Sequence, residues 1–224
     1  MNILMTNPSS RLSRELAQYL GSKHEVELAA GPFGHDQPTD ELVLGKHAII
    51  HSLKSDKTIR EVERLDESMR QTYNLLLAAV EQKVGKFLFL GSLSTMSGYD
   101  EDFLVNEKWK PVPTTDINTL SSHMSEIVCR EFGRERNIDV RCLRLGELYW
   151  DEQVDSSSAL LGEDALQAVE KVLTKEFSSS WPDSFLIPPP TWHVFHIQSL
   201  TPGARFSTQK AQDLLSYVPT EVEQ

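Results

Sequence analysis

Cysteine is scarce in this chain, in which Cys129 and Cys142 are the only two among 224 residues. They do not form a C-x-x-C pair, so the sequence predicts neither a disulfide framework nor a cysteine-based metal site. We interpret both as reduced interior residues. Runs of roughly 20 apolar residues, which a membrane span requires, are also missing, and Met1 leads directly into a strand-like segment without a signal peptide. We therefore expect a cytoplasmic protein with no membrane segment.

Clusters of positive charge are lacking as well. Lys and Arg number 22 against 33 Asp and Glu, which gives a net charge of −11. Nucleic acids and anionic membranes both require clustered basic residues, so neither is expected as a partner. A small molecule or nucleotide with a phosphate group is compatible with this composition, because a helix N-terminus and one arginine can hold a phosphate.

Metal-ligand motifs are the third absence. His47, His51, His193 and His196 lie within apolar segments. Their i, i+4 and i, i+3 spacings occur in metal sites, but no acidic ligand motif accompanies them. We interpret them as structural histidines and expect no metal.

The sequence does contain a regular alternation of short apolar runs and helical repeats. Strands are predicted near residues 2–6, 26–30, 47–52, 86–91 and 139–145. Apolar residues at helical spacing are Leu12, Leu16 and Leu20; Met69, Tyr73, Leu76, Leu77 and Val80; Leu120, Met124, Ile127, Val128 and Phe132; and Ala165, Val169, Val172 and Leu173. This alternation predicts an α/β fold with a doubly wound, mainly parallel, Rossmann-like sheet.

The turn after the first predicted strand resembles a known family pattern. It reads TNPSSRLSR over residues 6–14, which is similar to T-G-x-x-G-R-[IL]-G-R of extended short-chain dehydrogenase/reductases. Residues 47–53, 72–92 and 138–149 resemble later segments of that family, and residues 192–197 and 205–219 resemble the tail of sugar-nucleotide epimerases and uronate-dehydrogenase-like members. This collinear series identifies the chain as an atypical, NAD-dependent epimerase/dehydratase-like member. The resemblance implies one NAD(P)-binding domain over residues 1–224, with a reduced C-terminal substrate region from about residue 150.

The resemblance places cofactor contacts in this turn, but the turn departs from the pattern. The candidate contacts are Asn7, Ser9, Ser10, Arg11 and Leu12. Asn7, Ser10 and Ser13 replace the three glycines that let the backbone approach a pyrophosphate. We expect NAD or NADP to bind weakly or not at all, and Arg11 would favour NADP. The alternative is a plain strand-to-helix turn with Ser9 or Ser10 as N-cap.

The second predicted strand also departs from the family. It ends in Ala29-Ala30-Gly31, without the acid that would hold the ribose of NAD. Only 16 residues separate Ala30 from His47, where the family fits a further strand and helix. The outermost strand of the sheet is therefore predicted to be missing or vestigial.

The catalytic residues that the resemblance implies are absent. The family reaction uses a Tyr and a Lys four residues later on one helix, with a Ser or Thr at the preceding strand end. Aligning Glu126 with the family's glutamate puts Asn118 at the Tyr position and Ser122 at the Lys position, and Leu93 stands at the Ser position. Candidates for relocated catalytic groups are Ser92, Ser94, Asn118 and His123.

These departures lead to three functional hypotheses. The first is a degenerate member that has lost the family reaction and binds a ligand or a partner. The second is an NAD(P)-dependent oxidoreductase or sugar-nucleotide epimerase/dehydratase with relocated catalytic groups. The third is a hydrolase using Ser92 or Ser94 with His123, although no G-x-S-x-G motif surrounds either serine.

The resemblance also implies a homodimer. Extended members pair through the two helices that correspond here to residues 66–82 and 116–135. Each carries an apolar stripe wide enough to cover the sheet and leave an edge for a partner. The alternative is that the whole stripe packs on the sheet.

Overall fold

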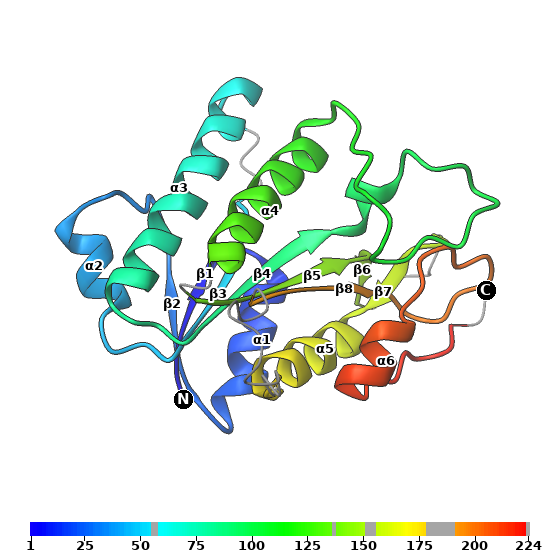
Figure 1. The fold of residues 1–224 in the computed structure, drawn as a ribbon. Coiled ribbons are helices and arrows are strands. Elements are labelled where there is room, and N and C mark those ends of the chain that lie inside the picture. Colours follow the sequence, from blue (N-terminus) through cyan, green and yellow to red (C-terminus); the bar gives the residue numbers. More distant parts are fainter. Residues whose placement is uncertain (55–57, 136–137, 151–155, 178–190, 223–224) are drawn as a thin grey trace, which may run out of the picture.

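The computed structural model describes residues 1–54, 58–135, 138–150, 156–177 and 191–222. The strands are β1 (Asn2–Thr6), β2 (Glu25–Ala29), β3 (Ala48–Ser52), β4 (Lys86–Ser92), β5 (Asp139–Leu145), β6 (Glu147–Tyr149), β7 (Ala159–Leu161) and β8 (Trp192–Ile197). Six of them form one parallel sheet in the order β2-β1-β3-β4-β5-β8, and β6 pairs with β7 (Figure 1). The predicted Rossmann-like, doubly wound α/β fold is confirmed.

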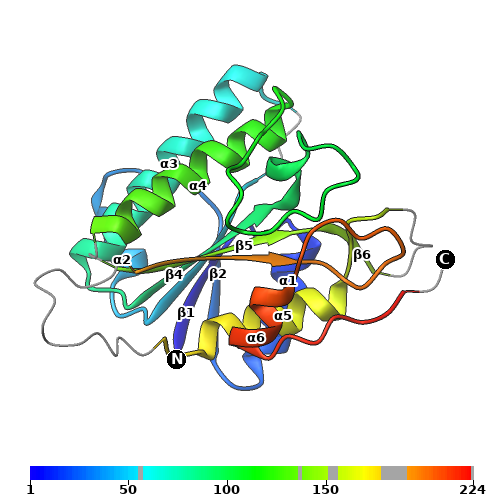
Figure 2. The ribbon, with the colours of Figure 1, turned by 45° about the vertical axis from the view of Figure 1, so that its right-hand side comes forward.

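Helices cover both faces of this sheet. They are α1 (Arg11–Gly21), α2 (Gln37–Val43), α3 (Glu61–Glu81), α4 (Ile117–Glu135), α5 (Gly162–Thr174) and α6 (Gln209–Leu215), with a short 3₁₀ helix, η1 (Leu93–Met96), after β4. In Figure 2, α2, α3 and α4 lie on one face and α1, α5 and α6 on the other. None of the helices in the described parts of the chain combines the length and apolarity needed to cross a membrane.

Two apolar cores follow from the alternation of side chains along the strands. Ile3, Ile50 and Leu143 pack with α1, α5 and α6. Ile49 and Phe87 point to the other face and pack with α2, α3 and α4. Because the central strands are buried on both faces, they are apolar at nearly every position, which is the pattern the sequence displays.

The β2 edge of the sheet is reduced, as predicted. No strand lies between Ala29 and Ala48, all of whose residues are described, and the seven-residue α2 is the only helix there. β2 itself begins one residue earlier than predicted. Its side chains are exposed or half-buried rather than enclosed, because it is the outermost strand.

The predicted apolar stripes of α3 and α4 do not match the buried faces. On α3 the buried side chains are Thr72, Leu75, Leu76, Ala78 and Ala79, while Met69, Leu77 and Val80 are half-buried and Tyr73 is 49% exposed. On α4 they are mainly small or polar: Thr119, Ser121, Ser122, Ser125, Glu126, Cys129 and Gly133. The α4 stripe that runs from Leu120 to Phe132 is only half-buried. Most of the residues assigned to the sheet by periodicity are therefore only partly buried, and Val80, Val128 and Phe132 pack against the edge of the core.

A buried arginine joins β5 to the end of α5. Arg141 is almost fully enclosed, and its Nη1 donates to the carbonyl oxygen of Lys175 at 2.7 Å and to that of Val172. Its Nε donates to Asp139 at 3.1 Å. The side chain thus satisfies carbonyl groups that the last turn of a helix leaves without partners, and its charge is paired.

Candidate functional site

Two adjoining pockets open at the carboxyl ends of the strands, where chain connections from β1 and β3 leave in opposite directions. The β4 pocket, of about 310 Å³, is lined by residues at or just after the ends of β1, β3, β4 and β5 and by residues of α3 and α4. The β2 pocket, of about 410 Å³, is lined by residues after β1, β2 and β3 and by α3. Both linings include Asn7, Leu53, Lys54 and Arg64. Ligands of open α/β sheets bind at this kind of crevice.

Asn7 stands at the first glycine position of the resembled pattern and has a left-handed backbone. Its φ is 59°, in the left-handed region that asparagine tolerates better than other non-glycine residues. Its side chain is held in place, because Nδ2 donates to the carbonyl oxygen of Leu53 at 2.9 Å and Oδ1 accepts from the hydroxyl of Ser9 at 2.9 Å. A side chain therefore lies where the two pockets adjoin and where the family pattern has only a hydrogen atom.

The other two replaced glycines have different surroundings. Ser13 is buried where α1 packs on β1, and its hydroxyl donates to the carbonyl oxygen of Thr6 at 3.1 Å. Ser10 occupies the N-cap position of α1, one of the two positions named for it, although its side chain makes no capping hydrogen bond. Ser10 and Leu12 instead line the β4 pocket, and Ser9 lines the β2 pocket.

Arg11 does not behave as predicted. It lines neither pocket, and its guanidinium carbon lies 4.9 Å from the centroid of the Trp150 ring. Its Nε is 3.9 Å from Glu15 on the same helix. Sequence alone does not predict that the Arg11 side chain packs on Trp150, because Trp150 comes to α1 from a segment after β6.

The end of β2 has no acid in the ribose position. Ala30, Gly31 and Phe33 line the β2 pocket there. The acid in that lining is Glu67, which comes from α3, on the opposite wall. The predicted absence of a ribose-binding acid at the end of β2 is therefore seen in the folded chain.

The structure places Asn118 and Ser122 side by side on the pocket face of α4. Both line the β4 pocket, one helical turn apart. Asn118 Oδ1 accepts a hydrogen bond from the guanidinium of Arg64 on α3. Ser122 is 6% exposed, and its hydroxyl has no hydrogen-bond partner among the described residues.

The N-terminus of α4 is capped by Asp116. Its carboxylate accepts from the backbone N–H groups of Asn118 at 3.0 Å and Thr119 at 2.9 Å. The bond from Thr119 is the main cause that lowers the pKa of Asp116 below its usual value. This cap fixes the first turn of α4 and hence the position of Asn118.

The structure does not bring the predicted nucleophile and base together. Ser92 lines the β4 pocket, but its hydroxyl donates to Ser94 Oγ at 2.9 Å, and Ser94 Oγ also accepts from Thr119 at 3.1 Å. His123 lines neither pocket, and no hydrogen bond joins it to either serine, all three residues being within the described chain. Burial lowers the pKa of His123.

The other histidines have structural positions. His51 lies between Thr6 and Thr72, with ring nitrogens 3.0 and 3.1 Å from their hydroxyl oxygens, and burial lowers its pKa to about 4. His47 accepts a hydrogen bond from the backbone N–H of Asn2. Among the residues that the structure describes, no three His, Cys, Asp or Glu side chains gather as a metal-binding group.

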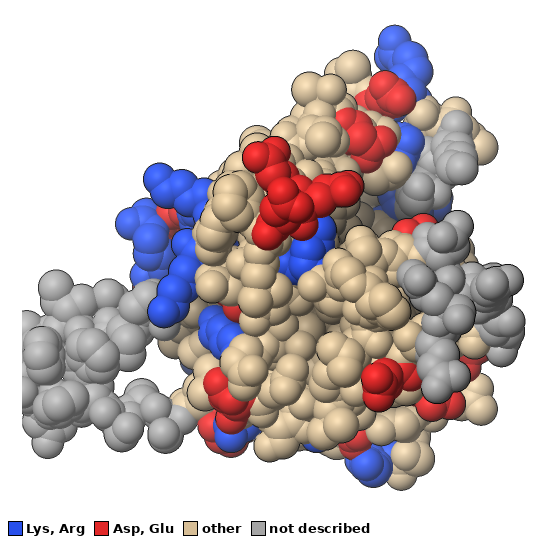
Figure 3. Space-filling view, turned by 90° about the vertical axis from the view of Figure 1, so that its right-hand side faces the viewer, with Lys and Arg blue, Asp and Glu red and all other residues tan. Residues whose placement is uncertain are grey.

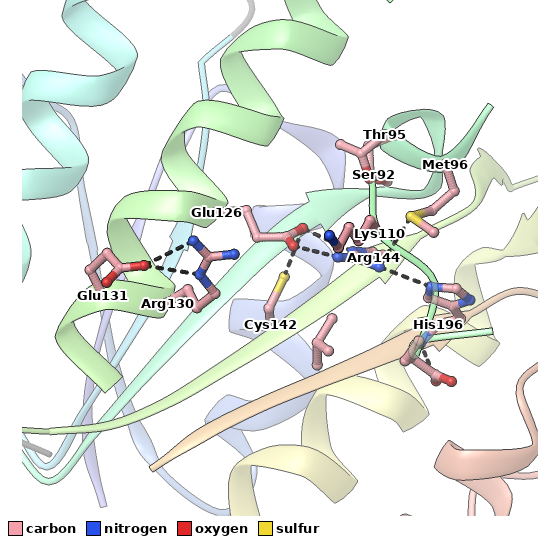
Figure 4. Close-up of polar contacts among 12 residues, drawn as sticks. Ser92, Thr95, Met96, Lys110, Glu126, Arg130, Glu131, Cys142, Arg144 and His196 are labelled. Atoms are coloured by element: carbon pink, nitrogen blue, oxygen red, sulfur yellow. Dashed lines mark hydrogen bonds and ion pairs between the residues drawn. The ribbon is translucent and has the colours of Figure 1, made fainter. Parts of the chain in front are cut away.

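A buried ionic cluster behind the β4 pocket was missed by sequence reasoning. Glu126 of α4 and Arg144 of β5 form an ion pair, and Arg144 Nη1 also lies 3.2 Å from Met96 Sδ and from His196 Nε2 (Figure 4). Burial is the main cause that lowers the pKa of His196 to about 3. The available signal was an arginine inside the apolar strand sequence VRCLRL, which requires a buried partner.

A comparison with protein-family sequence models finds a match. The sequence model of the NAD dependent epimerase/dehydratase family matches residues 22–175. A comparison with curated protein sequences finds no match.

Solved structures resemble the chain in fold. Uronate dehydrogenase from Agrobacterium tumefaciens superposes with a TM-score of 0.78 at 17% identity, over 98% of this chain and 84% of that one. UDP-N-acetylglucosamine 4-epimerase from Bacillus cereus gives a TM-score of 0.75 at 18% identity, over 98% and 93%. UDP-glucuronic acid 4-epimerase from Bacillus cereus, in complex with UDP-glucuronic acid and NAD, superposes with a TM-score of 0.76 at 14% identity, over 98% of this chain and 94% of that one. By the family match, the chain belongs to the NAD dependent epimerase/dehydratase family.

Proposed function

We propose that this chain is a ligand-binding member of its family that does not carry out the family's oxidation–reduction. The observation that carries the proposal is the pair Asn118 and Ser122 on the pocket face of α4. The resemblance assigns these positions to a Tyr and a Lys. An amide and an aliphatic hydroxyl do not ionise near neutral pH, so neither replaces that acid/base pair.

The contact between Arg64 and Asn118 supports the same proposal. The guanidinium of Arg64 donates to the amide oxygen of Asn118, the residue that the resemblance aligns with the family's tyrosine. Arginine keeps its proton at all accessible pH values, so it does not act as a general base. It is suited to holding an anionic or polar group of a ligand.

The dinucleotide fits this groove poorly. Asn7 and Ser10 place side chains where the glycine pattern leaves room for a pyrophosphate, and Asn7 is tied to Leu53. At the end of β2, alanine replaces the acid that would bind the ribose. NAD is present in structures of two relatives, the UDP-glucuronic acid 4-epimerase and a uronate dehydrogenase mutant. For this chain we propose weak or absent binding, and the position of Arg11 over Trp150 removes the reason to favour NADP.

Calorimetric titration with NADH and NADPH tests the proposal. We expect no saturable binding at micromolar concentrations. In the double variant Asn7→Gly/Ser10→Gly, we expect NADH to bind measurably, because both obstructing side chains are gone. Ser22→Gly, at the other end of α1, is the matched control and should leave binding unchanged. Micromolar binding of NADH by the unaltered chain, with NAD reduction in the presence of a uronate or UDP-sugar, would contradict the proposal.

A further inference from the structure

β2 is an outer strand of the main sheet, and its outward edge is unpaired. The strand pairs with β1 alone, and the backbone N–H of Glu25 donates to the carbonyl oxygen of Met1 at 3.0 Å. Alternate residues of a parallel strand face the same neighbour, so Val26 and Leu28 point their backbone N–H and C=O groups away from β1. Among the described residues, no hydrogen bond reaches these outward groups.

The helix that follows β2 in the chain leaves this edge accessible. α2 packs mainly against α3 (Figure 1). Three of the five side chains of β2 are exposed, namely Glu25, Glu27 and Leu28. Exposed edge strands accept an added strand, which is one of the ways in which sheets bind extended peptides.

The two faces of β2 differ in chemistry. Val26 packs against the core that contains α1, and Ala29 packs against the core on the other side of the sheet. Because side chains alternate along a strand, Leu28 lies on the face of Val26. Glu25 and Glu27 lie on the face of Ala29. A strand laid along β2 therefore meets apolar side chains on one face and carboxylates on the other.

These carboxylates make a second copy of the chain a poor occupant of the edge. Two β2 strands paired about a two-fold axis at their centre place Glu27 opposite its own copy, and like charges in that position destabilise a sheet. Glu27 is 2.5 Å from Lys46, yet its side chain stays 51% exposed. Glu25 forms no ion pair within the described chain. The charge pattern therefore favours a basic strand.

We propose that the β2 edge binds an extended segment of a partner protein in which Lys or Arg alternates with apolar residues. The basic side chains face Glu25 and Glu27, and the apolar ones continue the surface of Leu28. The backbone of the segment bonds to the outward groups of Val26 and Leu28. This surface is separate from the ligand site, because none of these four residues lines either pocket.

The probe for this edge is a blocked peptide of alternating Lys and Val. Calorimetry on the full chain at low salt is expected to show saturable binding that weakens as salt is added. Hydrogen exchange at the amides of Val26 and Leu28, followed by NMR, is expected to slow when the peptide binds. The same peptide N-methylated at its central residues keeps its charges and side chains but lacks backbone donors, so its affinity should be lower by about tenfold or more.

Two variants locate the binding surface. Leu28→Pro removes one outward N–H and keeps the bonds to β1, because proline is tolerated where the N–H of an edge strand faces solvent. Glu25→Lys reverses a charge on the acidic face. Each is expected to lower the affinity for the peptide about tenfold. Thermal unfolding of each variant checks that the fold is retained.

Glu101→Lys is the matched control for charge. Glu101 is exposed in the loop between η1 and α4, which extends to the right in Figure 1. Figure 3 shows that side of the molecule, where acidic side chains also gather. A basic peptide attracted only by negative charge would respond to this variant as it does to Glu25→Lys. A peptide bound at β2 should not respond to it.

The inference is overturned if the peptide does not bind at millimolar concentration, or if the N-methylated peptide binds equally well. It is also overturned if Glu25→Lys and Leu28→Pro bind like Glu101→Lys. Slow exchange at Val26 and Leu28 in the chain alone, lost on dilution, would assign the edge to a second copy in place of a basic partner.

Discussion

The carboxylate of Glu126 and the guanidinium of Arg144 form a two-point ion pair inside the protein. The Nε–Oε2 distance is 2.9 Å, the Nη2–Oε1 distance is 2.5 Å, and the two residues are 5% and 3% exposed. Cys142 Sγ lies 3.7 Å from the same carboxylate. Each charge is tolerated at this depth only because the other is present.

We expect Glu126→Ala to lower the free energy of unfolding by about 3–5 kcal/mol, because it leaves the charge of Arg144 buried without its carboxylate. Urea denaturation measures the loss. Glu131→Ala is the control on the same helix, since Glu131 pairs with Arg130 and Arg134 at the surface and should cost at most about 1 kcal/mol. Equal losses of unfolding free energy in the two variants would show that the buried pair stabilises the fold no more than a surface pair does. The double variant Glu126→Leu/Arg144→Met should recover much of the loss.

We expect the chain to form a homodimer through α3 and α4. The half-buried stripes on these helices lie beside each other, and the rings of Tyr73 and Phe132 meet edge to face with centroids 5.5 Å apart. Small and polar side chains of α4 face the sheet, and the apolar stripes of both helices are only partly buried, so they leave apolar surface that a second copy would cover. Light scattering should give twice the chain mass of 25.4 kDa.

Tyr73→Glu tests that interface by placing a charge in it, and we expect this variant to be a monomer. Leu104→Glu, at an exposed position between η1 and α4, is the control and should remain dimeric. A mass of one chain for the unaltered protein at every concentration would rule the dimer out.

We expect stability to fall as the pH is lowered from about 6.5 to about 4. Burial lowers the pKa of His51 from 6.5 to about 4, so the unfolded chain takes up a proton that the folded chain does not. The resulting contribution, about 3 kcal/mol, is fully present above pH 6.5 and is lost as the pH falls towards 4. His51→Gln should flatten this part of the profile in urea denaturation, and His47→Gln, at the surface, should not. An unchanged profile in His51→Gln would mean that other groups cause the acid sensitivity.

We expect a fluorophosphonate probe to label neither Ser92 nor Ser94. The hydroxyl of Ser92 donates to that of Ser94, and no hydrogen bond joins His123 to either of these described serines. Without a base the hydroxyl is a weak nucleophile. Mass spectrometry of the probe-treated protein checks this, with Ser92→Ala as the blank. Labelling that disappears in both Ser92→Ala and His123→Ala would restore the hydrolase hypothesis.

Much of the fold was predictable because burial on two faces leaves a direct trace in the sequence. Ile3, Ile49 and Phe87 belong to short apolar runs, and such runs between helical repeats specify a parallel sheet. The faces of α3 and α4 were harder to predict. Periodicity finds the apolar side of a helix, and here Ser125 and Cys129 are fully buried while Phe132 is only partly buried.

The residues of the candidate site were predictable only where they lie at the end of a predicted strand or at a known spacing on a predicted helix. The alignment on Glu126 placed Asn118 and Ser122 on one face, and both line the β4 pocket. Arg64 and Lys54 belong to no motif, and the approach of Arg64 to the pocket depends on how α3 packs. The contact of Arg11 was also not predictable from the sequence, because its partner Trp150 is distant in the chain.

The position of β8 bears on how the chain folds during synthesis. Five of the six strands of the main sheet are complete by Leu145, whereas β8 begins at Trp192. Until those later residues leave the ribosome, β5 presents an edge of open backbone N–H and C=O groups, and such edges recruit strands from other chains. Closing this edge requires a contact between distant parts of the sequence, which is formed slowly. The nascent chain therefore carries its greatest risk of aggregation at a late stage, when most of its sheet has already formed.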